Sequence, residues 1–394
     1  MKLKLLIYTH SWAPAIGGVE TVTAALAEGM AKSDRTCGGN PIAVQLVTRA
    51  PAADNQSDSP LAFEVIRRPS LGKFIRLFRS ADIIHLAGPA LLPMALAWLF
   101  NKRTVLEHHN YQSICPNGLL ILQPDWNICP GHYMAGHYRK CIECNSNGHG
   151  RMKSVRDLLL MFPRRWLAKR VTVNVAPSCH MQHRAALPRT QVIYHGVAQA
   201  GASSVSSGGY AARPACFAFV GRLVKEKGVS VLLRAAHQVL QKGHDFRLKI
   251  VGDGPERASL ESLAAELGLA HVTEFTGPMP MACLSTLLAD SAAVVMPSTW
   301  EDVAPLVALE QMMQGRLLIV SDIGGLGETV DEFGLKFPAG DATALASCML
   351  RVLRDPGFVE ALKANAQRHA SEAYTEQRMV EDHLRLYYEL MKRI

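Results

Sequence analysis

The stretch S-A-A-V-V-M-P-S-T-W-E-D-V-A-P-L-V-A-L-E-Q-M, residues 291–312, decides the fold of this chain. Its first part, residues 292–296, is an apolar run with the length and composition of a buried strand, and the run stops at Pro297. A loop follows up to Pro305. We predict that Pro305 opens a helix, because its fixed φ suits the first helical position and its missing N–H needs no partner there.

The start of this helix is predicted to bind an anion. The N–H groups of Leu306 and Val307 point out of the helix N-terminus at the carboxyl end of a strand, where a diphosphate can bind. Asp302 precedes the helix, and Glu310 lies about a turn and a half inside it, where its carboxylate can accept hydrogen bonds from ribose hydroxyls. The alternative is an ordinary strand, loop and helix, with acids near the helix start that suit its dipole.

Length and composition indicate a globular protein of two or three domains. The 394 residues are 48% hydrophobic and 19% charged, and no apolar run reaches the roughly 18 residues of a membrane span. The N-terminus has no apolar segment long enough for a secretory signal, so we expect a cytoplasmic protein. Its nine cysteines are then expected to be reduced or metal-bound.

The charge is concentrated in the first half. Residues 1–198 hold 23 Lys and Arg against 11 Asp and Glu, whereas the remainder has a net charge of −4. This predicts an anionic partner, either a membrane surface or a phosphorylated acceptor, unless the basic face is merely solvated. Two basic amphipathic helices, residues 71–80 and 153–170, are candidates for peripheral contact with the inner face of an anionic membrane. Pro163 is expected to interrupt the second helix.

Strands and helices alternate along the chain, which favours an α/β fold with parallel, doubly wound sheets. We predict an N-terminal domain (1–198) with a Cys-rich insertion (111–150), a linker (199–213), a C-terminal domain (214–375) and a terminal helix (376–394) that returns to the first domain. The strands are predicted at residues 3–8, 43–48, 63–68, 82–86, 104–107, 171–175, 191–194, 217–220, 247–251, 272–275, 292–296 and 317–320.

Candidate binding residues follow the predicted strands of the first domain. Gly17 and Gly18 lie between a strand and a helix, where backbone N–H groups can approach an anion or a sugar. His109 follows the strand at residues 104–107 and can bind a sugar hydroxyl or stabilise developing charge. His85 and His108 have no such context and are expected to be structural.

Four cysteines in the insertion predict a metal site. Cys115, Cys129, Cys141 and Cys144 include one C-x-x-C pair in a segment rich in Gly, Asn, His and Pro, which could not build a core of its own. A tetrahedral structural zinc site is expected, with His132, His137 and His149 as substitute ligands. An iron–sulfur cluster and free thiols in an irregular loop are the alternatives.

The second domain opens with a second set of candidate residues. Gly221-Arg222-Leu223 is followed by Lys227-Gly228, and two fixed cations there can stabilise a departing diphosphate without a bound metal. Gly252 ends a further predicted strand, close to the place where a nucleotide that carries this diphosphate is expected to bind. The alternative for this stretch alone is a solvated basic turn before a helix.

These motifs resemble the family 4 retaining glycosyltransferases. Residues 297–310 are similar to that family's E-x7-E signature, with Asp302 in place of the first Glu and Glu310 as the second. The elements G-G-V-E from Gly17 and G-R-L-x-x-x-K-G from Gly221 also resemble family motifs. The chain departs from the family at Asn110, where Asp is common after the histidine, and at His195, where Asn is usual.

The resemblance implies the GT-B fold, with two Rossmann-like domains facing across a cleft, and transfer of a sugar from a UDP or GDP donor to a glycan or lipid-linked acceptor. By resemblance, Arg222, Lys227 and the amides at 306–307 stabilise the diphosphate, Glu310 holds the ribose, Asp302 supports the donor sugar, and His109 contacts a sugar hydroxyl. No metal is expected to be required for catalysis.

Two other functions remain open from the sequence. A nucleotide-sugar 2-epimerase shares this fold and needs no acceptor. A non-catalytic, metal-dependent binding protein would instead act through the cysteine segment. No nucleic-acid partner is expected.

Overall fold

The computed structural model describes residues 3–13, 17–32, 41–51, 61–199 and 214–392 of the chain. The chain divides into two compact units, which are described here one by one. The first unit contains residues 1–197 and 374–394, and the second contains residues 198–373. The predicted linker lies almost wholly outside the described residues, as do residues 14–16 ahead of the glycine pair.

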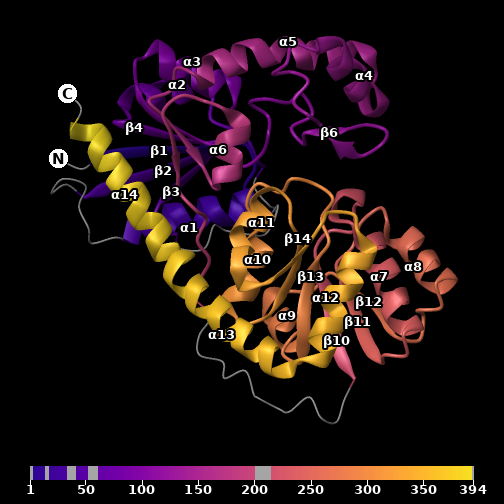
Figure 1. Cartoon of the computed structure of the whole chain (residues 1–394). Helices are drawn as coiled ribbons and strands as arrows, with labels where there is room; N and C mark the ends of the chain where they lie inside the picture. The colour runs from indigo at the N-terminus through magenta and orange to yellow at the C-terminus, as the bar shows by residue number, and fades with distance from the viewer. Residues whose placement is uncertain (1–2, 14–16, 33–40, 52–60, 200–213, 393–394) are drawn as a thin grey trace. The chain divides into compact units, whose positions relative to one another are not determined.

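The first unit is built on a seven-stranded parallel sheet, coloured indigo to magenta in Figure 1, with the strand order β3-β2-β1-β4-β5-β8-β9. Its strands are β1 (Leu3–Thr9), β2 (Ile42–Thr48), β3 (Glu64–Arg67), β4 (Ile83–Ala87), β5 (Arg103–Glu107), β8 (Val173–Ala176) and β9 (Thr190–Val192). β1 is almost fully buried and pairs with β2 on one side and β4 on the other, from Leu5 opposite Ile83 to Thr9 opposite Ala87. The order of the strands therefore reverses beside β1, and ligands bind at the carboxyl edge of such a switch point.

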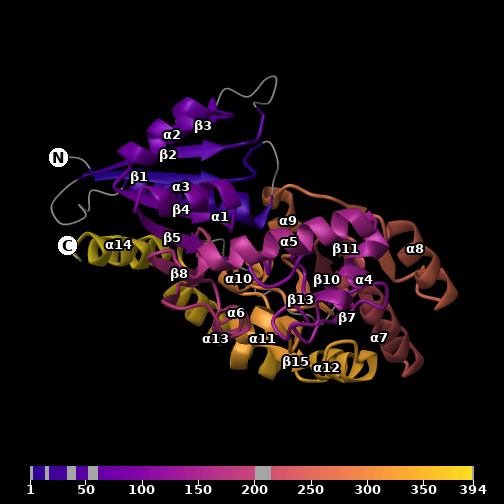
Figure 2. The ribbon, with the colours of Figure 1, turned by 90° about the horizontal axis from the view of Figure 1, so that it is seen from above.

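Helices cover this sheet and continue into the insertion. They are α1 (Gly18–Lys32), α2 (Leu71–Ser80), α3 (Leu91–Leu99), α4 (Tyr138–His149), α5 (Arg151–Ala168), α6 (Cys179–Ala185) and α14 (Glu376–Lys392). Ser70 caps α2, because its side chain accepts a hydrogen bond from the N–H of Lys73. Figures 1 and 2 both show α14 alongside the first unit, where it packs against α1.

The second unit is a six-stranded parallel sheet with the order β12-β11-β10-β13-β14-β15. Its strands are β10 (Ala215–Val220), β11 (Phe246–Val251), β12 (Thr273–Gly277), β13 (Ser291–Met296), β14 (Leu318–Ser321) and β15 (Leu335–Phe337). Its helices are α7 (Val229–Gln241), α8 (Arg257–Glu266), α9 (Met281–Leu287), α10 (Leu306–Met313), α11 (Gly324–Val330), α12 (Ala342–Arg354) and α13 (Pro356–Ala373), with short 3-10 turns at Lys225–Lys227 and Asp331–Phe333. Here the strand order reverses between β10 and β13.

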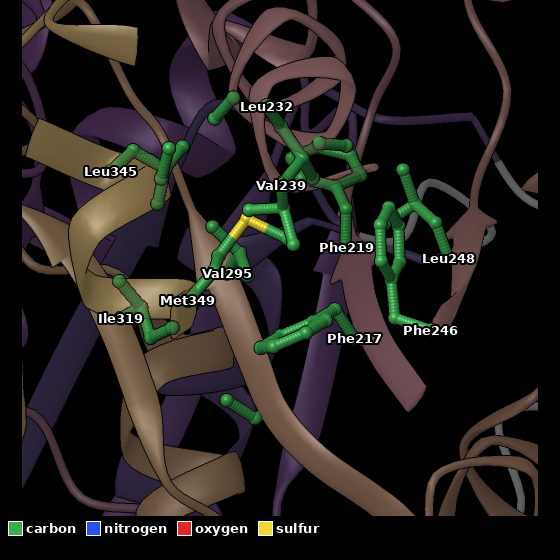
Figure 3. Packing of buried hydrophobic residues seen from close by; sticks show 14 of the residues in the cluster. Phe217, Phe219, Leu232, Val239, Phe246, Leu248, Val295, Ile319, Leu345 and Met349 are labelled. Atoms are coloured by element: carbon green, nitrogen blue, oxygen red, sulfur yellow. The ribbon is translucent and has the colours of Figure 1, made fainter. Parts of the chain in front are cut away.

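The core of the second unit fixes this sheet against its helices. All six side chains of β13 are buried, as its continuous apolar sequence predicts for a central parallel strand. Figure 3 shows the packing of strand residues against helices α7 and α12. The labelled side chains are all nearly inaccessible to solvent: Phe217, Phe219, Leu232, Val239, Phe246, Leu248, Val295, Ile319, Leu345 and Met349.

The sequence prediction omits the short strand β15, and three further details of it are wrong. Helix α5 continues through Pro163, because Leu158, Met161 and Leu167 bury one face of the helix on both sides of the proline. Pro305 precedes α10 instead of opening it, since its ψ of 104° is extended and its carbonyl accepts the first helical hydrogen bonds.

The third concerns the Cys-rich insertion, which is more ordered than predicted. Residues 121–122 and 127–128 pair as a short hairpin, β6 with β7, and Tyr138–His149 form helix α4. The insertion also builds a small core, in which Tyr133 and Cys141 pack with Leu158 and Met161 of α5. The Tyr133 ring and the Cys141 thiol suffice to form this small core because α5 supplies the remaining apolar surface.

Candidate active site

The candidate site of the second unit lies at the switch point between β10 and β13. Parallel strands end at the same edge of a sheet, so the turn that follows β10 and the loop that follows β13 meet there. The first turn carries Arg222 and Lys227, and the second loop carries Asp302. Sequence motifs about 75 residues apart are thereby brought to one edge.

Lys227 and Asp302 form an ion pair at this edge. The Lys227 Nζ lies 2.6 Å from Asp302 Oδ2, and the two side chains are 24% and 12% exposed. The same ammonium lies 5.6 Å from the centre of the Trp300 ring. The backbone of Asp302 is fixed as well, because its carbonyl accepts a hydrogen bond of 2.6 Å from the N–H of Gly325 at the start of α11. Both partners of the ion pair therefore have a further contact, Lys227 with the Trp300 ring and Asp302 through its backbone carbonyl.

Two glycines allow the loops to pack this closely. Gly228 has a φ of +67°, and a Cβ there would overlap the carbonyl oxygen of Pro297. Gly252 at the end of β11 has a φ of +138°, and a Cβ would overlap the carbonyl oxygen of Gly221. Both positions need a left-handed backbone and the absence of a side chain. The close approach of the Pro297 carbonyl therefore explains why the G-R-L-x-x-x-K-G sequence ends in a glycine.

Helix α10 presents its N-terminus at the end of this loop. The first helical hydrogen bonds are donated by Ala308 and Leu309 to the carbonyl of Pro305, so the amides of Leu306 and Val307 precede the helical ladder.

Glu310 and Arg222 are the remaining predicted residues of this unit. Burial raises the pKa of Glu310 to about 7, because the loss of solvent around this half-buried carboxyl disfavours its charged form. Arg222 is exposed at the turn after β10, where its guanidinium is accessible to a ligand. The structure pairs only Lys227 with Asp302 directly among the predicted residues of the second unit.

The first unit has a cavity of about 880 Å³ at its own switch point. It is lined by Tyr8 near the end of β1, by His10 and Ser11 after that strand, and by Gly88 after β4, and the predicted residue His109, which follows β5, also lines it. Gly17 and Gly18 are not among its lining residues, although Val19 of the same turn is. The glycine pair begins α1, where the carbonyl of Gly17 accepts the hydrogen bond of the Thr21 N–H.

This cavity is cationic and partly apolar. Arg49, Arg68 and Arg164 line it, and its described lining includes no Asp or Glu. Within the described residues the buried Nε of Arg164 has no hydrogen-bond partner, and burial lowers the pKa of this guanidinium. Apolar side chains, among them Phe74, form the rest of the wall. The arrangement is suited to a ligand with both an anionic and an apolar part.

A buried carboxylate, missed by the sequence reading, lies beside the cavity. Glu107 at the end of β5 is 1% exposed and is surrounded by the rings of His85, His109, His195 and His383. Burial by itself would raise the pKa of Glu107, but the neighbouring histidines outweigh burial and hold it well below its ordinary value. The only sequence signal is that histidines follow β5 and lie within the buried β4.

His108 and His85 were both expected to have a structural role, and only His108 has that role alone. His108 fulfils it, with hydrogen-bonding contacts to Asn174 Oδ1 at 2.9 Å and Ser113 Oγ at 3.1 Å. His85 instead contacts Glu107 at 2.9 Å and the hydroxyl of Tyr387 on α14 at 2.8 Å.

The four predicted metal-binding cysteines lie in one neighbourhood and are free thiols. Cys141 and Cys144 are on α4, Cys115 lies in the turn after the His108-His109 pair, and Cys129 follows the hairpin. Groups of three or more His, Cys, Asp or Glu ligand atoms within 4.8 Å of one another occur, in the described part of the chain, only around Glu107. The cysteine sulfurs are thus more widely spaced than four ligands on one ion.

Backbone N–H groups nevertheless surround two of the sulfurs. The N–H of Gln123 donates to Cys144 Sγ at 3.2 Å. Burial raises the pKa of Cys115 to about 11, although hydrogen bonds from the backbone of Leu120, Asn117 and Gly118 oppose that shift. Such donors stabilise a thiolate and are what a metal-bound sulfur requires from its surroundings.

Helices α3 and α5 share an exposed apolar surface, which we call the α3–α5 patch. On α5 its side chains recur at intervals of three and four residues and so lie on one face. Trp98 of α3 and Trp166 of α5 meet edge to face with ring centroids 5.1 Å apart, and Arg170 lies 3.7 Å over the Trp166 ring. The patch consists of Trp98, Leu99, Met152, Val155, Leu159, Phe162 and Trp166. No helix in the described residues has both the length and the hydropathy of a bilayer span.

Comparison with protein families finds one match, in the second unit. Residues 207–369 match the family described as Glycosyl transferases group 1. An uncharacterized glycosyltransferase of Methanocaldococcus jannaschii is 34% identical over 171 residues, which are 43% of each chain. The alpha-D-kanosaminyltransferase of Streptomyces kanamyceticus is 32% identical over 150 residues, or 38% of this chain and 39% of the relative. The chain therefore matches about two fifths of the length of these curated relatives.

Solved structures resemble the whole chain at low identity. Sucrose-phosphate synthase from Thermosynechococcus elongatus has a TM-score of 0.73 at 19% identity, over 99% of both chains. Anabaena HepE in complex with UDP has a TM-score of 0.72 at 20% identity, over 99% of this chain and 100% of that one. The predicted α/β class with two doubly wound parallel sheets is confirmed. Residues 207–369 thus resemble the Glycosyl transferases group 1 family, and the chain has the GT-B fold of its structural neighbours.

Proposed function

We propose that this protein is a retaining glycosyltransferase of family 4 type that transfers a sugar from a nucleotide diphosphate donor to an acceptor. The observation that carries the proposal is the Lys227–Asp302 ion pair beside the N-terminus of α10, at the switch point of a group 1 glycosyl transferase domain. UDP and UDP-glucose are bound in structures of HepE, which has the same fold. These complexes support a uridine nucleotide as the first donor to test.

The donor is activated by charge in this proposal. Cleavage of the bond from sugar to diphosphate releases a dianion, and cations that are fixed before reaction stabilise it at little reorganisation cost. Lys227 supplies one cation, Arg222 a second, and the amides of Leu306 and Val307 add the positive end of the α10 dipole. Asp302 orients Lys227 and lies near the donor sugar.

The remaining donor contacts follow from the same arrangement. Glu310 accepts hydrogen bonds from the ribose hydroxyls, and its partial burial makes each such bond count more than in water. His109 contacts a sugar hydroxyl from the acceptor side. None of these side chains acts as a nucleophile in the proposal, so the acceptor attacks the face that the diphosphate leaves, and the anomeric configuration is retained.

The acceptor is proposed to be a lipid-linked glycan that carries phosphate. The cavity of the first unit brings three arginines and apolar side chains together without an acid in its described lining, which suits a phosphate next to a hydrocarbon chain. The buried, unpaired Nε of Arg164 supports an anionic ligand further.

Such an acceptor resides in a membrane, and the α3–α5 patch supports peripheral binding there. Its tryptophans and aliphatic side chains are exposed, and Lys153 and Arg156 on α5, with Lys169 and Arg170 directly after it, provide attraction to anionic headgroups. We expect the protein to cosediment with phosphatidylglycerol vesicles, and Leu159→Asp with Trp166→Ala to abolish this. Tyr388→Ala, which removes an exposed aromatic residue on α14, serves as the control. Equal sedimentation of all three proteins would contradict the assignment.

We further propose that the cysteine segment binds a structural zinc ion. Cys115, Cys129, Cys141 and Cys144 would supply a tetrahedral thiolate set of the kind that zinc prefers once their sulfurs move closer together around the ion, and the N–H donors at Cys115 and Cys144 suit metal-bound sulfur. The ion would hold the segment that follows His109 and would take no part in the transfer. The expected result is that Cys141→Ser with Cys144→Ser lowers the zinc content of the purified protein by about one equivalent.

The function is tested by supplying UDP-glucose or GDP-mannose with a polyprenyl diphosphate-linked sugar and analysing the products by mass spectrometry and NMR. We expect a lipid-linked product with the same anomeric configuration as the donor, and release of the nucleotide only in step with transfer. Conversion of the donor to a free epimer without acceptor would establish the epimerase instead. Metal-dependent binding without turnover of any donor would establish a binding protein.

A further inference from the structure

Five titratable side chains of the first unit converge on one buried point, and only His109 among them has a role in the proposed transfer. They come from separate parts of the chain: His85 from β4, Glu107 and His109 from the end of β5, His195 from the segment after β9, and His383 from α14. We call this group the Glu107 cluster. All five side chains are at most 5% exposed.

The imidazole Nε2 atoms point at the carboxylate. Distances to Glu107 Oε2 are 2.9 Å for His85, 3.7 Å for His109 and 4.0 Å for His383, and Oε1 lies 3.3 Å from His195 Nε2. Two sets of three, His85–Glu107–His383 and Glu107–His109–His195, have their ligand atoms within 4.8 Å of one another. The side chains are thus arranged around a common centre.

The hydrogen bond of His383 to the backbone determines its tautomer. Its Nδ1 lies 2.8 Å from the carbonyl oxygen of Met379, and a carbonyl only accepts, so Nδ1 carries the proton. The neutral ring then presents the Nε2 lone pair toward the carboxylate of Glu107, 4.0 Å away. Two lone pairs face each other across a gap that is suited to a cation.

Other atoms of the cluster also lack a partner. Within the described residues, His109 Nε2, His383 Nε2 and His195 Nδ1 have no hydrogen-bond partner, and Glu107 Oε1 and His195 Nε2 have only their mutual contact at 3.3 Å. Buried polar atoms of this kind are rare because each costs about 1–3 kcal/mol. A proton would serve one pair of these atoms, whereas one metal ion would serve several.

We propose that the Glu107 cluster binds a divalent transition-metal ion, with His85, Glu107 and His383 as ligands and His109 within reach as a fourth. Ligands about 2.1 Å from one ion lie roughly 3.0–3.5 Å apart, so small side-chain adjustments bring the three together. Imidazole and carboxylate without thiolate suit zinc, iron(II) and related ions over magnesium or calcium.

The surroundings have the second layer of contacts that metal-bound histidines require. The Nδ1 of His383 is fixed by Met379, and the Nδ1 of His85 lies 2.8 Å from the hydroxyl of Tyr387, one turn further along α14. Such contacts orient a ligating ring and raise its basicity. The ion would tie α14 to β4 and β5, and it would fix His109 at the wall of the cavity. This proposal goes beyond the transfer reaction and does not rest on it.

The test measures metal directly in the full chain. In a Cys141→Ser, Cys144→Ser background, which removes the thiolate pair, we expect about one equivalent of zinc or iron by elemental analysis after purification without chelator. His85→Asn with His383→Asn is expected to weaken metal affinity at least tenfold. His237→Asn is the matched control, because the Nδ1 of His237 likewise contacts a carbonyl oxygen, that of Leu267, at 2.8 Å but no carboxylate.

A second measurement covers variants that fail to fold. The same background protein is stripped with a chelator and titrated with cobalt(II), and we expect weak visible absorption of a nitrogen and oxygen site without the charge-transfer band of thiolate. Zinc is expected to raise the melting temperature of the stripped protein. A metal-free protein whose melting temperature does not change on titration, or unchanged metal content in the His85, His383 double variant, would overturn the proposal.

Discussion

The two units hold their charged groups in different ways. In the second unit, Lys227 and Asp302 are partly exposed, lie in loops that follow adjacent strands, and come from short motifs. In the first unit, Glu107 is fully buried and its partners come from strands, loops and the terminal helix. Short motifs at one strand edge therefore suffice to form the Lys227–Asp302 pair, whereas the Glu107 cluster needs side chains from many parts of the chain.

The largest effect is expected when both cations of the second unit are removed. Arg222→Ala with Lys227→Ala should lower kcat/KM for the donor by roughly 10³-fold or more, since each fixed donor to a developing anion contributes about 10²–10³ in rate. Lys242→Ala, an exposed lysine at the end of α7, is the control. Transfer at the wild-type rate in the double variant would show that Arg222 and Lys227 do not stabilise the departing diphosphate.

The next effect concerns the backbone that supports the ion pair. Gly228→Ala is expected to destabilise the protein by about 3 kcal/mol or more, because a Cβ would overlap the Pro297 carbonyl in addition to the cost of a left-handed φ. Gly243→Ala has a similar φ of +79° with open space around it and should cost only about 1 kcal/mol. Chemical denaturation measures both, and equal losses would show that the close approach to Pro297 does not matter.

A smaller change is expected from the cavity of the first unit. Arg164→Gln should raise KM for a phosphorylated acceptor by roughly tenfold to a hundredfold, since a charged hydrogen bond contributes about 1.5–3 kcal/mol. KM for the donor should stay unchanged. Measuring KM for acceptors with and without the phosphate shows whether Arg164 binds that phosphate. A change in donor KM of the same size would mean that Arg164 acts on the second unit's ligand.

The smallest effect is a pH dependence that belongs to the second unit. Because burial raises the pKa of Glu310 to about 7, its carboxyl is protonated below and ionised above that pH. Donor KM should therefore fall several-fold as the pH rises from 6 to 8, as the carboxylate becomes a better acceptor for ribose. The folded state binds the extra proton, so this group lowers the free energy of unfolding as the pH rises from about 4.5 to 7. Glu310→Gln should flatten both profiles.

The sequence predicts the second unit better than the first for a physical reason. Arg222, Lys227 and Asp302 lie in loops after apolar strands, and the strand order of a doubly wound sheet brings such loops together. Apart from β15, the strands of the two parallel sheets were also predicted to within one or two residues at most ends, because a buried parallel strand is a continuous apolar run. The contact between the Lys227 and Asp302 side chains could not be predicted from the sequence and is seen only in the structure.

The Glu107 cluster was not predictable in the same way. Its members are separated by up to 298 positions along the chain, from His85 to His383, and no local pattern links them. Helix α4 was missed because Gly, Asn and Ser lower its intrinsic helix propensity, whereas packing of Cys141 on α5 stabilises it. Pro163 was misjudged for a related reason, since tertiary burial of α5 outweighs the local penalty.

Helix α14 has a consequence for how the protein is made. His383 and Tyr387 complete the interior of the first unit, yet they are synthesised only after the entire second unit. During synthesis, the sheet formed by residues 3–192 therefore lacks α14, and the Glu107 cluster lacks His383, until nearly two hundred further residues have been made. The second unit, contiguous in sequence, has no such delay and can finish folding first.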